Sequence, residues 1–110
     1  MHAAPYLYYY RKGYTSDRYL LEFVSGVALP SFQADLLNAL TSIHPLVVET
    51  EELWMNDEVC YHIDSDLGPF TLSKDIWDQA FLMDASEGRC INSIHEILLE
   101  DQRFRCISKD

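Results

Sequence analysis

The strongest constraint on the fold is an apolar stripe at helical spacing, which follows Ser31 and stops before His44 and Pro45. The stripe consists of Phe32, Leu36, Leu37, Leu40 and Ile43. Apolar residues at this period lie along one face of an α-helix, and Ser31 is a typical N-cap residue. The sequence therefore predicts a helix over residues 32–43, with its apolar face directed at a core.

Segments of strand character flank this helix on both sides. Residues 6–11 are rich in tyrosine and predict a strand, while residues 18–25 favour a second strand over a short capped helix. Residues 46–55 and 58–63 predict a hairpin, because the second segment alternates apolar and polar side chains and Asn56 and Asp57 between them are turn formers.

The remaining segments add both kinds of element. Residues 70–72 predict a short strand, residues 74–83 a second helix, residues 91–98 a third helix, and residues 103–107 a closing strand. The second helix is expected to bury Ile76, Trp77, Ala80 and Phe81. The predicted core comprises Leu36, Leu37, Leu40, Ile76, Phe81, Ile94 and Leu98.

Strands and helices are mixed here without regular alternation. This order favours an α+β fold with a mostly antiparallel sheet of about four to six strands and two or three helices packed on it. The chain has 110 residues and contains no internal repeat or linker. We expect a single domain over residues 1–110.

Charge is segregated along the chain. Of eighteen acidic residues, fifteen lie at or after Glu49, so the net charge of -10 belongs to the second half. Residues 49–66, the acidic hairpin, contain no Lys or Arg. Hydrophobic residues make up 48% of the chain, which excludes a disordered acidic tail. A field of this sign repels duplex DNA and RNA and favours encounter with a basic protein.

The cysteines and the N-terminus suggest a compartment. Cys60, Cys90 and Cys106 are odd in number and widely spaced, which fits reduced thiols better than disulfides or a zinc motif. No basic segment precedes an apolar one near Met1, and no apolar stretch approaches the roughly 20 residues of a spanning helix. We expect a soluble cytoplasmic protein with no membrane association and no cofactor.

The acidic hairpin is the first candidate functional site. Aromatic and sulfur-containing side chains among carboxylates are what a binder of a basic protein surface needs. The alternative is that these acids only keep a strand soluble and prevent edge-to-edge aggregation. The predicted partner-binding residues are Glu49, Glu51, Glu52, Trp54, Met55, Asp57, Glu58, Tyr61, Asp64 and Asp66.

Two other sites compete with this one. Cys60, His62, Asp64 and Asp66 alternate and would share one face of a strand, so metal-assisted hydrolysis is the enzymatic alternative. Same-face residues on a strand lie about 6.5 to 7 Å apart, which is wide for one ion. The tyrosine-rich strand of residues 6–10 could instead serve a structural homodimer, because tyrosine supplies rigid contact area.

The sequence contains no nucleophile elbow, phosphate-binding glycine loop or catalytic cysteine signature. The expectation is therefore a small acidic protein-binding module, not an enzyme. In general character it resembles the small acidic immunity proteins that neutralise bacterial toxins, or phage-encoded inhibitors that mimic nucleic-acid charge. This likeness is one of composition and covers no motif. It implies a basic, nucleic-acid-handling protein as the partner.

Overall fold

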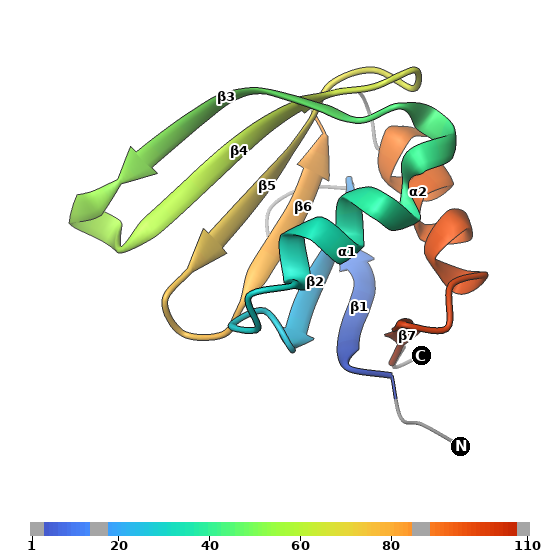
Figure 1. Ribbon diagram of the computed structural model, residues 1–110, viewed down its shortest axis with the longest axis horizontal. Coiled ribbons are helices and arrows are strands. Elements are labelled where there is room, and N and C mark those ends of the chain that lie inside the picture. The colour runs from blue at the N-terminus through green and yellow to red at the C-terminus, as the bar shows by residue number, and fades with distance from the viewer. Residues whose placement is uncertain (1–3, 14–17, 85–88, 108–110) are drawn as a thin grey trace.

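The computed structural model describes residues 4–13, 18–84 and 89–107 (Figure 1). The strands are β1 (Tyr6–Lys12), β2 (Tyr19–Ser25), β3 (Leu46–Leu53), β4 (Glu58–Asp64), β5 (Phe70–Asp75), β6 (Ala80–Asp84) and β7 (Phe104–Cys106). The α-helices are α1 (Phe32–Ala39) and α2 (Arg89–Leu99), and two 3-10 helices are η1 (Thr41–Ile43) and η2 (Trp54–Asn56). The α+β prediction is confirmed.

All seven described strands form one sheet in the order β3-β4-β5-β6-β2-β1-β7. Neighbouring strands are antiparallel except β1 and β7, which run parallel. The sheet is therefore mixed and larger than the four to six strands predicted from the sequence. The strand β3 forms one edge, and its many exposed acids and a bulge between Val47 and Glu49 discourage pairing with another chain.

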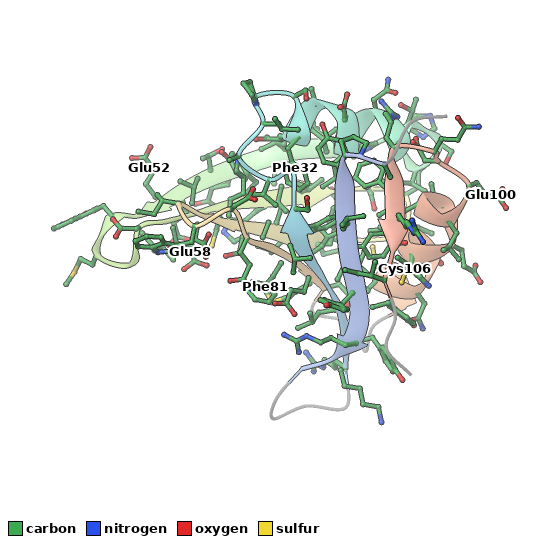
Figure 2. All side chains as sticks on the ribbon, turned by 90° about the horizontal axis from the view of Figure 1, so that it is seen from below. Phe32, Glu52, Glu58, Phe81, Glu100 and Cys106 are labelled. Atoms are coloured by element: carbon green, nitrogen blue, oxygen red, sulfur yellow. The ribbon has the colours of Figure 1, made fainter. Side chains whose placement is uncertain are left out.

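Both α-helices cover the same face of the sheet. Phe32 of α1 lies edge-on to Tyr6, with ring centroids 5.4 Å apart, and His95 of α2 lies edge-on to Tyr8 at 5.7 Å. Tyr6 and Tyr8 alternate along β1 and so point to one side. A single cluster of buried residues joins the helices to this face. Figure 2 shows Phe32 between α1 and the sheet, and Phe81 on the opposite side.

The first helix forms nearly as the sequence predicts. α1 spans eight residues and continues into η1, and Leu36 and Leu40 are fully buried. The Ser31 hydroxyl does not cap the helix; it lies 2.9 Å from the Tyr6 hydroxyl instead. The later helix α2 has eleven residues and buries Ile94 and Leu98 as expected. No helix in the described ranges is long and apolar enough to cross a membrane.

The second predicted helix, over residues 74–83, is wrong. This segment is the end of β5, a turn and β6, and its pairing with β4 and β2 satisfies the backbone of both strands. Ile76 and Trp77 are exposed, whereas the sequence interpretation buried them. Phe81 is half-buried on the sheet face opposite the helices. Ala80 and Leu82 are buried and alternate with less buried residues, which is the period of a β-strand.

The hairpin of β3 and β4 extends past both helices, as the green and yellow-green strands of Figure 1 show. On the helix side of the sheet, Tyr61 of β4 pairs with Leu72 of β5, and Val59 pairs with Lys74. Leu72 is fully buried, but Val59 and Tyr61 are only half-buried. The apolar face of the sheet thus continues beyond the part that the helices cover.

Candidate partner-binding site

Four large apolar side chains lie exposed at one end of the sheet, and we call them the tip. They are Trp54 (78% exposed), Met55 (82%), Ile76 (64%) and Trp77 (73%). The first two belong to η2, between β3 and β4, and the others follow β5. Glu58 pairs with Asp75 across β4 and β5, which places both turns at the same end of the sheet.

The turn between β5 and β6 is held by aspartates. The Asp75 side chain accepts hydrogen bonds from the backbone N–H groups of Trp77 at 2.8 Å and Gln79 at 3.2 Å. Asp78 adopts a left-handed conformation with φ of 62° and accepts a hydrogen bond from the N–H of Ala28 at 2.7 Å. Aspartate tolerates this conformation better than most residues. These bonds reverse the chain and direct Ile76 and Trp77 outward.

The turn between β3 and β4 is built in a similar way. Asp57 has a φ of 53°, and its N–H donates to the Trp54 carbonyl over 3.3 Å. This closes the single 3-10 turn of η2. The Trp54 and Met55 side chains in this turn both project into solvent.

Beside the tip, a groove of about 390 Å³ opens on the helix side of the sheet. Val59 and Tyr61 form its floor, since both point to this side in the register of β4 and β5. Trp54 and Ile76 line it from the two turns. The groove therefore lies on the uncovered continuation of the apolar sheet face.

Acidic residues and one lysine line the groove. Glu52, Asp57, Glu58 and Asp75 line it together with Lys74. Within the described part of the chain, the carboxylates of Glu52 and Asp57 have no hydrogen-bond or ion-pair partner. The Glu58 carboxylate accepts a hydrogen bond from the Ser73 hydroxyl, on the face of the sheet opposite the groove. The Lys74 ammonium lies 5.8 Å from the centre of the Phe32 ring, toward α1. Two acidic groups thus remain available to a partner.

The structure divides the ten predicted partner-binding residues. Five of them line the groove, and Met55 lies beside it in the tip. The five are Glu52, Trp54, Asp57, Glu58 and Tyr61. Glu49 and Glu51 pair with His62 and Cys60, which places them on the opposite face of the sheet. Asp64 ends β4 at the end of the strand remote from the tip, and Asp66 lies beyond it.

Sequence reasoning missed Ile76 and Trp77. The sequence predicts both in a buried helix, whereas the structure places them in the tip. A turn signal in the sequence could have placed them correctly, because Asp75, Asp78 and Gln79 flank the pair. An aspartate side chain that bonds to the backbone two residues later is a common way to reverse a chain.

The four residues of the hydrolase alternative do not converge. His62 faces Glu51 at 3.2 Å on one ring nitrogen and the Thr71 hydroxyl at 3.3 Å on the other. Asp66 instead pairs with His44 at 2.6 Å. Within the described residues, no three His, Cys, Asp or Glu side chains are arranged to hold a metal ion.

Cys60 and Cys90 are free thiols of low reactivity. Burial raises the pKa of Cys90 to about 11, and the nearby Asp84 carboxylate adds to the effect. Burial also raises the pKa of Cys60, with the Glu58 carboxylate acting in the same direction. Both thiols therefore stay protonated at neutral pH, and the protonated thiol is a poor nucleophile.

The tyrosine-rich strand is mostly core. Tyr6 and Tyr8 are buried, and Tyr10 stacks on His95 with ring centroids 4.1 Å apart. The strand β1 lies between β2 and the short strand β7, which pairs with Tyr6, Leu7 and Tyr8. Of the predicted contact surface, Tyr9 is the tyrosine that points to the face opposite the helices.

Comparisons with known proteins found no match among family models, curated proteins or solved structures. The case for function therefore rests on the geometry of the tip and the groove.

Proposed function

We propose that this protein is an acidic protein-binding module, and that the tip and the adjoining groove form its contact surface. The observation that carries the proposal is the exposure of Trp54, Met55, Ile76 and Trp77 together at one end of the sheet. Trp54 of one turn and Ile76 of the other line the same groove, and large exposed apolar patches on a protein surface usually mark an interaction site. Tryptophan is the residue type most enriched among the anchors of protein interfaces.

Charge selects the kind of partner. The groove beside the tip is lined by the acidic residues Glu52 and Asp57, and the whole chain carries a net charge of -10. Such a surface attracts a basic protein over long range and disfavours acidic ones. In its finer form, the proposal is an intracellular inhibitor of the immunity or phage type, which covers the basic surface of a nucleic-acid-handling enzyme. The likeness in composition supports this form.

The experiment compares single variants in the capture and binding of a basic partner. Wild-type protein on a support is exposed to native lysate, and each captured protein is then measured by surface plasmon resonance. Trp54→Ala and Trp77→Ala should each speed dissociation and raise Kd about thirtyfold, equivalent to roughly 2 kcal/mol, as loss of a desolvated anchor does. The matched control is Leu99→Ala, because Leu99 is a similarly exposed apolar residue on α2.

The control should bind as wild type does. Each variant must first show a native circular dichroism spectrum and a cooperative melt, so that loss of binding is not loss of folding. If every captured protein binds Trp54→Ala and Trp77→Ala as tightly as wild type, the tip is not the contact surface. The acids would then act only as a solubility device.

A further inference from the structure

The groove beside the tip combines three kinds of surface that rarely occur together. Its floor is the apolar and aromatic pair Val59 and Tyr61, and the Trp54 indole stands at its tip end. The acidic residues Glu52 and Asp57 line the same space. A ligand that fits must therefore present a flat or apolar surface and a positive charge at once.

Two carboxylates are placed to receive that charge. Glu52 comes from the end of β3 and Asp57 from the turn into β4, so they enter the groove from successive parts of one hairpin. Neither has a partner among the described residues, and Glu52 is exposed, with no side-chain hydrogen bond to fix it. Glu58 and Asp75 are already engaged, by Ser73 and by the β5–β6 turn.

From this geometry we infer that the groove receives an arginine side chain of the partner. Its guanidinium would stack on Trp54 or Tyr61 and donate hydrogen bonds to Glu52 and Asp57, while its methylene stem would lie on Val59. This inference rests on the proposed function and specifies which group of a basic partner the site recognises.

Arginine fits better than lysine for physical reasons. A guanidinium is planar, stacks on aromatic rings, and donates from a rigid fork that matches carboxylates. An ammonium is a compact, strongly hydrated charge, and its desolvation in a partly apolar groove costs more. Cation–π attraction is also strongest for tryptophan among the aromatic residues.

The test uses a minimal probe that needs no partner. N-acetyl-L-arginine amide is titrated into the full chain while the indole N–H signals are followed by NMR. The chain has two tryptophans, and Trp54→Phe and Trp77→Phe assign the two signals. The chemical shift of the Trp54 signal should change and saturate at arginine amide concentrations on the order of 10 mM, because a single side chain binds weakly. The corresponding citrulline amide, which is neutral and nearly isosteric, should give no saturable shift.

Two further comparisons locate the probe. The lysine amide should bind at least about threefold more weakly than the arginine amide. Glu52→Gln should weaken arginine binding about threefold or more, whereas Glu51→Gln should leave it unchanged, because Glu51 lies on the opposite face of the sheet. Both variants remove one charge from adjacent positions, so the long-range field changes equally.

Three results would each overturn the inference: no saturable shift of the Trp54 signal by about 100 mM arginine amide, an equal shift with citrulline amide, or equal weakening by Glu51→Gln and Glu52→Gln. The two proposals fail separately. If a basic partner needs Trp54 and Trp77 but the arginine amide leaves Trp54 unmoved, the contact surface stands and the arginine inference is wrong. If partner binding is independent of both tryptophans, the proposed function is wrong.

Discussion

Gly26 is the residue at which a single added carbon should do most damage. Its φ is 84°, and a Cβ there would lie 2.4 Å from the Pro5 carbonyl oxygen and 2.6 Å from the Tyr6 ring. Both neighbours are fixed, since one is backbone and the other a buried side chain. We expect Gly26→Ala to lower the free energy of unfolding by roughly 3 kcal/mol or more, from strain and overpacking together.

Gly68→Ala is the matched control for that substitution. Gly68 also has a positive φ, of 107°, but a Cβ there would have no neighbour within 4 Å. Only backbone strain should appear, at about 1 to 2 kcal/mol. Urea denaturation of the two variants measures the difference. Equal losses at Gly26 and Gly68 would mean that the contact with Pro5 and Tyr6 is not as close as described.

His95 should make stability depend on pH. Its Nδ1 lies 3.0 Å from the Tyr8 hydroxyl, and its ring stacks on Tyr10. Burial lowers the pKa of His95 from its ordinary value, against a smaller opposing effect of the Glu96 carboxylate. The unfolded chain therefore binds a proton at this residue more readily than the folded chain does. Its contribution to stability is present above the ordinary pKa and is lost as pH falls through it.

The variant that tests this is His95→Gln, which keeps a polar side chain but cannot titrate. Between about pH 7.5 and 5.5, the wild type should lose more stability than His95→Gln does, as measured by urea denaturation at each pH. Below that range the many carboxylates dominate, so the comparison stops there. If the free energy of unfolding falls equally in both proteins, the pKa of His95 does not differ between the folded and the unfolded chain.

At the scale of elements, the hairpin of β5 and β6 depends on one aspartate. Asp75 accepts two backbone hydrogen bonds in the turn that displays Ile76 and Trp77. Asp75→Ala should lower the free energy of unfolding by about 1 to 2 kcal/mol, which is typical of side-chain to backbone hydrogen bonds in turns. Asp75→Ala should also weaken partner binding, because Trp77 loses its fixed position.

Glu49→Ala provides the control for Asp75→Ala, since it removes one acid from an exposed position on β3. It should change stability by less than about 0.5 kcal/mol. Thermal denaturation and the fluorescence anisotropy of Trp77, measured in a Trp54→Phe background, read out the two effects. Unchanged anisotropy in Asp75→Ala would show that the aspartate does not order the turn.

The same hairpin shows how far the sequence determines the elements. The helix at residues 32–43 and the hairpin of residues 46–63 carry their periods locally, so both could be predicted. Residues 76, 77, 80 and 81 also fit a helical period, and only pairing with β4 and β2 selects the strand. The local propensity of a segment carries no information about those distant strands. The parallel strand β7 joins β1 from nearly the other end of the chain for the same reason.

The candidate site was predictable to a similar extent. The acidic hairpin and Trp54 were found because charge and aromatic residues are visible in the sequence. The sequence does not predict which acids share a face of the sheet. The bulge beside Val48 shifts the register of β3 and separates Glu49 and Glu51 from the groove. Ile76 and Trp77 join the tip only through the pairing of β4 with β5.

At the scale of the whole molecule, three basic residues lie at the end of the sheet remote from the tip. Arg11 and Lys12 end β1 and Arg18 precedes β2, at the end where Asp64 and Asp84 end β4 and β6, so the cations offset acids there. The tip and its carboxylates occupy the other end. A basic partner should therefore meet the protein tip first, because the field orients the encounter.

The most direct test of this account reverses one charge on each face of β3. Glu51→Lys and Glu52→Lys change the net charge equally at adjacent positions, but only Glu52 lines the groove. At low ionic strength both should slow association with the partner, because both weaken the long-range field. At about 1 M salt, where screening acts within roughly 3 Å, only Glu52→Lys should still weaken binding. Equal weakening by Glu51→Lys and Glu52→Lys at high salt would contradict a contact surface built on the groove.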